Sequence, residues 1–228
     1  MKQVSQNFKN AMKQYGKQIT SIILYTENGI EKTLSTDDLF SVTLITNGNI
    51  LKSVMKQLNF DSSVKLEKDT EIKYKFGVLL SNNQYEYIDY GNYIVAEEPE
   101  YNADTLSYTH KCYDKMIYSM KDYESLNVTY PITIKNYLTA LANKIGLTLE
   151  NTTFYNQDKE ILNELYLTAD GDSLGYTYRD VLDEIAQATG SIICVNDNDN
   201  IEVKYLTTTN ETINEDLLKD VNVTMKEQ

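Results

Sequence analysis

Short segments with alternating apolar and polar residues, separated by tight turns, fill the first half of this 228-residue chain. Asn28-Gly29 lies between two such segments, where an Asn-Gly pair is the strongest local signal for a β-hairpin. Ser81–Gln84 predicts another hairpin turn. The expected strands are residues 18–26, 39–45, 63–66, 71–80, 85–89, 93–99 and 106–113. Such a series predicts an antiparallel barrel or sandwich.

Helical periodicity replaces this alternation after Pro131. Residues 133–145 place apolar side chains on one helical face, and Gly146 follows as a stop signal. A second helix is expected from Thr177 to Gly190, where Asp180 lies three residues after Thr177 and completes a shortened capping box. Short strands are expected at 147–149, 191–195 and 201–206, and the last two form a hairpin around the turn 196–200.

The two expected helices match each other at a fixed offset. A shift of 44 residues superimposes Thr133 on Thr177, Leu138 on Leu182, Leu141 on Ile185, Ala142 on Ala186 and Gly146 on Gly190. The match indicates either an internal duplication or the likeness that any two capped amphipathic helices share.

We therefore predict an α+β, mainly β chain: an antiparallel barrel-like β domain and a smaller helix-plus-hairpin region. An N-terminal amphipathic helix or arm (1–17) carries Phe8 and Met12 at helical spacing. The first barrel-like domain covers 18–128, and the second, α+β domain covers 129–228 with two similar helix–strand units at 133–149 and 177–206.

Acidic residues outnumber basic ones, 34 Asp and Glu against 21 Lys and Arg, which gives a formal net charge of −13. Such a chain is repelled by phosphate backbones, so no nucleic-acid binding is expected. Apolar runs are too short for a membrane span, and the first residues lack a secretory signal pattern. Cys112 and Cys194 form no CxxC pair, which favours a reduced compartment without a disulfide framework.

Several residues that suggest chemistry are better explained by structure. His110 and Cys112 fall on one predicted strand, and a zinc site needs three or four ligands. Residues 196–200 alternate Asn and Asp but lack the glycine and the bidentate glutamate of a calcium loop, which favours a turn. Asp170 and Asp172 flank a glycine and are expected to solvate a loop rather than act as a carboxylate pair. We predict no catalytic, cofactor-binding or metal-binding residues, and no cofactor.

Three stretches, in their order and spacing, carry a family resemblance. They are Phe8–Ala11 with Ile19–Ile22 and Thr36–Thr43; Tyr90–Val95 leading through Leu106–Thr109 to Cys112–Met116 and Tyr130-Pro131; and Thr177–Leu182 with Ile185-Ala186 and Gly190. In this arrangement the sequence resembles the hub domain of bacteriophage tail proteins. That domain is the N-terminal part of tail-associated lysins and prophage endopeptidase-tail proteins, and it is similar to the baseplate hub of contractile phages.

The resemblance implies a homotrimeric ring in the virion tail tip. Its implied partners are the distal tail protein or tail tube, the tape-measure protein and a spike or fibre. Longer relatives carry enzymatic or binding modules after the hub, whereas residues 221–228 read like the start of a strand, so a chain truncated at its C-terminus is expected. The resemblance therefore implies a structural protein without enzymatic activity.

Two other classes of function remain open at this stage. The 19 tyrosines are compatible with a cell-wall glycan-binding module, although the absence of Trp argues against it. A peptidoglycan hydrolase or peptidase with an unrecognised carboxylate pair is the other alternative.

Within the motifs, we expect Tyr113 and Met116 to face a core and Asp114 to cap the helical turn after its strand. Arg179 is expected either to bridge to a neighbouring carboxylate or to lie solvated on the surface. Tyrosine-rich strands are expected to supply subunit contacts, and acidic side chains to line the lumen of the ring.

Overall fold

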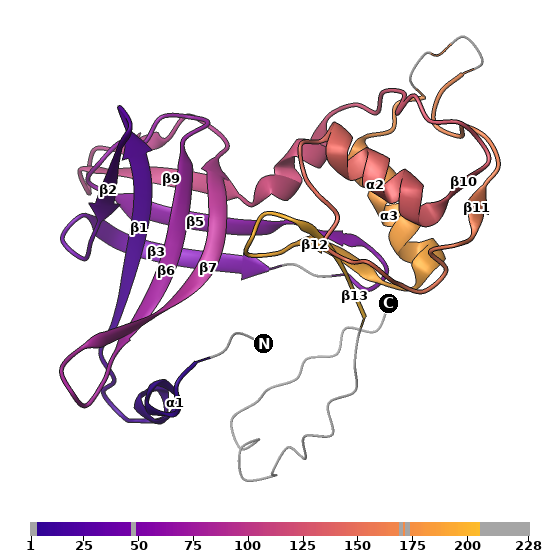
Figure 1. Ribbon diagram of the computed structural model, residues 1–228. Coiled ribbons are helices and arrows are strands. Elements are labelled where there is room, and N and C mark those ends of the chain that lie inside the picture. The colour runs from indigo at the N-terminus through magenta and orange to yellow at the C-terminus, as the bar shows by residue number, and fades with distance from the viewer. Residues whose placement is uncertain (1–3, 47–48, 169–170, 172–173, 206–228) are drawn as a thin grey trace, which may run out of the picture.

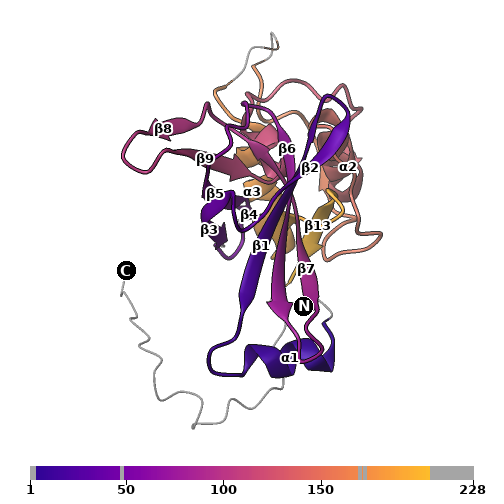
Figure 2. The ribbon, with the colours of Figure 1, turned by 90° about the vertical axis from the view of Figure 1, so that its left-hand side faces the viewer.

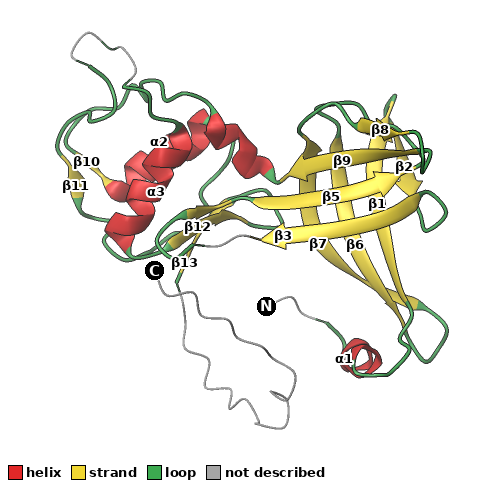
Figure 3. Cartoon of the chain, turned by 180° about the vertical axis from the view of Figure 1, so that it is seen from behind, coloured by secondary structure: helices red, strands yellow, loops and turns green. Residues whose placement is uncertain are grey.

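The computed structural model describes residues 4–46, 49–168, 171 and 174–205. Most of its strands form a large sheet at one end of the molecule, and its two longest helices lie at the other end (Figure 3). The chain is mainly β with antiparallel sheets, as the sequence predicts. None of the helices in the described ranges combines the length and apolar character that crossing a membrane requires.

The large sheet has the strand order β2-β1-β6-β7-β9-β5-β3, with β8 paired to β9. Its strands are β1 (Ile19–Glu27), β2 (Ile30–Leu34), β3 (Leu39–Thr46), β5 (Lys56–Ser62), β6 (Glu71–Leu79), β7 (Tyr85–Val95), β8 (Glu100–Asn102) and β9 (Ser107–Tyr113). All its pairs are antiparallel. The sheet curves into a barrel-like half-shell (Figure 1), but in the described part β2 and β3 remain its two ends.

Alternation along each strand separates the core from the surface. In β5, Leu58 and Phe60 are buried, whereas the neighbouring Gln57 and Asn59 are only half-buried. Leu58 and Phe60 pack with Ile23 and other inward-facing side chains in one apolar cluster. Burial of each large apolar side chain contributes about 1.5–3 kcal/mol, so this face fixes the register of the sheet.

Two strand predictions are corrected by the structure. Residues 63–66 form no strand; the strand is β5, directly before them, and Ser62 Oγ donates to Val64 O where the chain turns away. The predicted strands 85–89 and 93–99 are largely one strand, β7, which ends at Val95. The register between β6 and β7 is irregular at Gly91. Lys73 pairs with Asn92 and Lys75 pairs with Asp89, so two residues of β7, Tyr90 and Gly91, lie opposite one residue of β6.

The predicted N-terminal helix is present as α1 (Gln6–Met12). It lies at the foot of β1, β6 and β7, away from the helical end of the molecule (Figure 2). Phe8 and Ala11 pack on Val78 of β6, and Ser5 caps the helix while bonding to Glu86 of β7. An isolated helix of 7 residues is only marginally stable in water, so these contacts with the β6–β7 hairpin stabilise α1.

The second half contains η1 (Lys115–Met120), β10 (Ile132–Thr133), α2 (Ile134–Lys144), β11 (Glu160–Ile161), α3 (Tyr178–Thr189), β12 (Ile192–Val195) and β13 (Ile201–Lys204). Helices α2 and α3 share one apolar core with the β12–β13 hairpin. The predicted capping box at Thr177 and the predicted end of the helix at Gly190 are both confirmed, and Gly190 has a left-handed backbone conformation.

The residues that match at the 44-residue offset occupy equivalent places. Thr133 and Thr177 are both N-caps, and the next three pairs, Leu138 with Leu182, Leu141 with Ile185, and Ala142 with Ala186, are all buried in the shared core. Gly146 and Gly190 both have positive φ, at 79° and 65°. The expected strand at 147–149 is reduced to one parallel bridge between Leu149 and Ile201.

One pairing was not predicted. The short strand β4 (Ser53–Val54) pairs in parallel with β12, so a segment between β3 and β5 becomes the edge of the small sheet. Ser53 also donates through its backbone N–H and its hydroxyl to Asp183 of α3. The two halves of the chain are therefore joined by backbone and side-chain bonds.

Candidate functional site

The structure buries the residues that suggested metal or nucleophile chemistry. The His110 ring stacks on Phe60 at 4.4 Å and accepts a hydrogen bond at Nε2 from the backbone N–H of Leu66 (3.0 Å). Burial lowers the pKa of His110, which favours the neutral ring, and raises the pKa of the Cys112 thiol to about 12. Both residues contribute to the interior of the large sheet. Asp170 and Asp172 lie outside the described residues.

Residues 196–200 form the tight turn between β12 and β13, as predicted. Asn196 closes it: its side-chain oxygen accepts from the backbone N–H groups of Asn198 (2.9 Å) and Asn200 (3.0 Å). Asp199 has a φ of 62°, the left-handed conformation that short Asx side chains tolerate. Across the described ranges, no group of three His, Cys, Asp or Glu side chains has a geometry that holds a metal ion.

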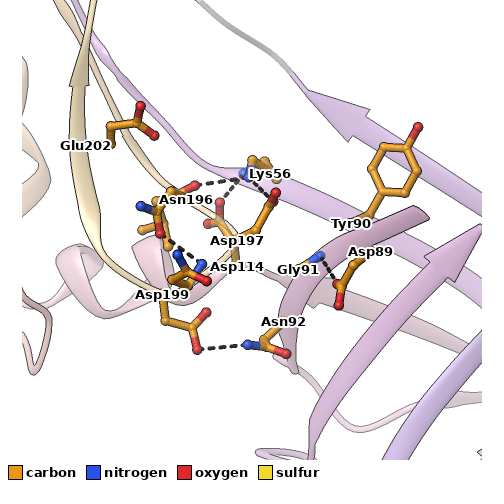
Figure 4. Close-up of polar contacts among 12 residues, drawn as sticks. Lys56, Asp89, Tyr90, Gly91, Asn92, Asp114, Asn196, Asp197, Asp199 and Glu202 are labelled. Atoms are coloured by element: carbon orange, nitrogen blue, oxygen red, sulfur yellow. Dashed lines mark hydrogen bonds and ion pairs between the residues drawn. The ribbon is translucent and has the colours of Figure 1, made fainter. Parts of the chain in front are cut away.

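This turn is also a docking element, and that role was not predicted. Asp199 Oδ2 accepts a hydrogen bond from Asn92 Nδ2 of β7 at 2.9 Å (Figure 4). The same oxygen lies 3.0 Å from Lys115 Nζ of η1. Lys56 of β5 donates from Nζ to Val195 O at 3.0 Å and lies 4.0 Å from Asp197. The small hairpin is thus fastened to the large sheet by charged and polar bonds. We call these residues, together with Asp114, the polar junction: Lys56, Asn92, Asp114, Lys115, Asp197 and Asp199.

Asp114 is the most buried carboxylate of the polar junction, with 3% of its surface exposed. Its Oδ1 accepts from the backbone N–H of Met116 (3.2 Å), so it caps η1 as predicted, and its Oδ2 accepts from that of Lys56 (3.1 Å). Burial raises the pKa of Asp114 to about 6, although the two backbone bonds and the nearby charges of Lys56 and Arg179 oppose the shift. Met116 is fully buried, as expected, whereas Tyr113 is half-buried.

Arg179 packs where the two halves meet. One guanidinium nitrogen lies 3.7 Å from Met120 Sδ and 3.9 Å from Met55 Sδ, and another donates to Ser53 O at 3.5 Å. The side chain is half-buried rather than fully solvated. A bridge from Arg179 to a neighbouring subunit stays a prediction.

A second polar network, centred on Glu164, organises the loop between α2 and α3. Glu164 Oε2 accepts from the hydroxyls of Tyr130 (3.0 Å) and Tyr123 (3.2 Å), and Tyr123 shares a 2.8 Å bond with Tyr137. Glu164 Oε1 accepts from the backbone N–H groups of the next two residues. Many of the tyrosines in this half are therefore fastened inside the protein. The sequence offers no local signal for Glu164, because its partners come from distant elements.

We compared the chain with known proteins. No protein-family model and no curated protein matches it. Among solved structures, a 43 kDa tail protein of prophage MuSo2 from Shewanella oneidensis matches 82% of this chain with a TM-score of 0.53 and 12% sequence identity. The chain has the fold of a phage tail protein. A tail protein from Neisseria meningitidis shares this tail-protein fold over 81% of the chain, with a TM-score of 0.52 and 13% identity.

The tail-protein fold extends to a PdpA–VgrG complex from Francisella, with a TM-score of 0.50, 9% identity and 92% of this chain covered. The matches cover 55% and 50% of the two tail proteins and 31% of the matched chain in the complex. This chain therefore spans about half the length of the tail proteins that it matches. At such low identity the likeness defines the fold and carries no individual residue role.

Proposed function

We propose that this protein is a structural component of a phage, prophage or tailocin tail tip, where it forms a homotrimeric hub ring around the DNA channel. In this role it links the tail tube or distal tail ring to the spike or fibre, beside the tape-measure protein. The observation that carries the proposal is the tail-protein fold, found in two tail proteins from different bacteria.

The proposed organisation keeps an arm (1–17), a sheet domain (18–128) and a helical domain (129–228). Separate apolar clusters in the large sheet and around α2 and α3 support two domains, and Met116 and Tyr123 already pack in the second cluster. The polar junction and the β4–β12 pairing hold the two domains against each other. A junction of many directional bonds suits a fixed arrangement of the two domains.

We propose that acidic side chains face the lumen and that exposed tyrosines contribute to subunit contacts. The net charge of −13 supports the first point, because carboxylates repel DNA and let it pass. Tyr85, Tyr87 and Tyr101 are exposed at 40%, 42% and 55% and support the second. We propose no catalytic activity for this chain. Release of muropeptides from purified peptidoglycan would overturn this, and retention on cell walls would favour the glycan-binding alternative.

The test is the solution mass of the purified chain, followed by electron microscopy of the particle. Three copies of the 26.2 kDa chain give about 79 kDa, and light scattering over a tenfold concentration range should return that mass with ring-shaped particles. If the chain alone is a monomer, it is mixed with tail tubes purified without the tip. Failure to bind their distal end would overturn the proposal.

A further inference from the structure

The two ends of the large sheet differ in how they are protected. Strand β2 is short, at 5 residues, and carries Glu31 and Lys32. Strand β3, at the other end, has 8 residues with the sequence LFSVTLIT and contains no charged residue, proline or glycine. Natural edge strands are usually shortened, charged or broken by proline, because an open edge offers unpaired backbone groups to another strand. Among the described residues β3 pairs only with β5, so its outer edge is open.

The register shows which backbone groups of β5 point toward β3. Lys56 directs both its N–H, to Asp114 Oδ2, and its C=O, to Asp114 N, toward the β9 side. Backbone groups alternate in direction along a strand, so those of Gln57, Asn59 and Asp61 point toward β3.

The partners of these three residues in β3 are Ile45, Thr43 and Ser41. Their backbone groups are therefore bonded to β5. By the same alternation, the N–H and C=O groups of Val42 and Leu44 point away from the sheet. The open edge thus presents a regular row of donors and acceptors.

A small apolar hollow lies at the start of this edge. It has a volume of about 190 Å³ and is lined by β1 and β3 residues that include Ile19, Phe40 and Val42, with no charged side chain in its lining. Ile19 and Phe40 are exposed at 54% and 57%. In strand addition, backbone bonds supply affinity and such hollows select side chains.

We propose that the β3 edge accepts an extended segment of another protein as an added strand. The segment alternates apolar and hydroxyl-bearing residues, and an apolar side chain enters the hollow beside Ile19 and Phe40. It carries a lysine or arginine at the end that lies beside the start of β3, because Asp37 and Asp38 directly precede this strand. The edge variants described below distinguish this occupant from a second copy of the chain. This inference does not depend on the proposed role in a tail.

The test uses the full chain and a synthetic peptide of alternating Thr and Val with a lysine at each end. The matched control peptide carries N-methyl groups on two consecutive central residues, which blocks both of its edges. We expect the first peptide to bind with a Kd below about 100 μM, and the control to bind at least tenfold more weakly. Equal binding of the two peptides, or no binding of the first at about 1 mM, would overturn the proposal.

Amide hydrogen exchange locates the binding. In the free protein, the amides of Val42 and Leu44 should exchange fast and those of Thr43 and Ile45 slowly, and the peptide should slow only the first pair. Slow exchange of Val42 and Leu44 in the free chain, or peptide binding that leaves them fast, would contradict the assignment.

Two variants distinguish peptide binding at the β3 edge from binding at the β2 edge. Val42→Pro removes an outward N–H from β3 and should abolish peptide binding, whereas Thr33→Pro makes the same change on the outer edge of β2 and should leave it intact. Circular dichroism checks that both variants fold, and the N-methylated peptide keeps the test valid if one does not. Dimerisation of the chain that is lost in Val42→Pro would identify a second copy as the occupant and refute the proposal.

Discussion

Asp199 and Asn92 are 107 residues apart in sequence, yet their side chains meet at 2.9 Å and fasten the β12–β13 turn to β7 of the large sheet. The same carboxylate is paired with Lys115 at 3.0 Å, and each of these two charged side chains is only 20% exposed. Charged pairs that are mostly shielded from water interact more strongly than surface pairs, so this contact is a main bond of the polar junction.

Asp199→Ala should loosen the polar junction. Lys115 would keep only its 3.5 Å contact with the exposed Glu71, and Asn92 would lose its acceptor. We expect a loss of about 1–3 kcal/mol in the free energy of unfolding, measured with urea. Lys65→Ala is the control, because Lys65 pairs with Glu67 and Glu98 on the surface, and its loss should cost clearly less than the loss of Asp199. Equal losses in both variants would contradict this view of the junction.

Asp114 should make stability depend on pH in a defined direction. Its pKa is 3.8 in a model compound and about 6 in the folded chain, so between these values the folded state binds more protons than the unfolded state. The contribution of Asp114 is therefore favourable at low pH and is lost as pH rises through 6. Measured by denaturation between pH 4.5 and 7.5, wild type should lose about 1–3 kcal/mol relative to Asp114→Asn over this range. Parallel pH curves for the two proteins would exclude this role.

Gly77→Ala should destabilise the hairpin formed by β6 and β7. A Cβ at Gly77 would lie 2.6 Å from Tyr87 Cε1 and 2.8 Å from Thr20 Cγ2, because the tyrosine ring covers the glycine from the paired strand. We expect a loss of about 1–2 kcal/mol in thermal or urea unfolding. In a Tyr87→Ala background the same substitution should cost less, since the ring no longer occupies the space. A cost that is independent of Tyr87 would show that the contact is not responsible.

The two N-caps provide a matched comparison. Thr177 and Asp180 form a complete capping box on α3, whereas Thr133 only accepts from the backbone N–H of Asn136 at the start of α2. Thr177→Ala should therefore destabilise the protein by about 1–2 kcal/mol, and Thr133→Ala by about half as much. The free energy of unfolding of the two variants, measured side by side, tests the order. A larger loss for Thr133→Ala would reverse it.

Much of the local structure follows from neighbouring residues in the sequence. The Asn28-Gly29 turn, the helix N-caps at Thr133 and Thr177 and the left-handed glycine at Gly190 all depend on interactions within a few residues. Alternation predicted most strands of the large sheet, with the error at 63–66 arising where a polar loop continues the pattern. The cap at Asp114 was predicted for the same local reason.

The candidate site was only partly accessible to such reasoning. The turn at 196–200 was predicted as a turn, and its Asn196 bonds are local. That Asp199 meets Asn92 and Lys115, or that Glu164 accepts from the hydroxyls of Tyr123 and Tyr130, depends on how distant elements pack. Side-chain pairing over such separations leaves no periodic or positional mark in a single sequence.

The sequence by itself determined most strands of the large sheet, the caps and the alternation that buries one face of this sheet, because these arise from backbone preferences and apolar periodicity over a few residues. Only the tertiary structure decided that β4 pairs with β12, that the small hairpin docks through Asp199, and that β3 is the last strand in the order of the large sheet in the described part of the chain. The physical reason is that these contacts form when segments far apart in the chain are brought together by burial of the shared cores. Which residues form these contacts is decided by the geometry of the folded chain rather than by neighbouring residues in the sequence.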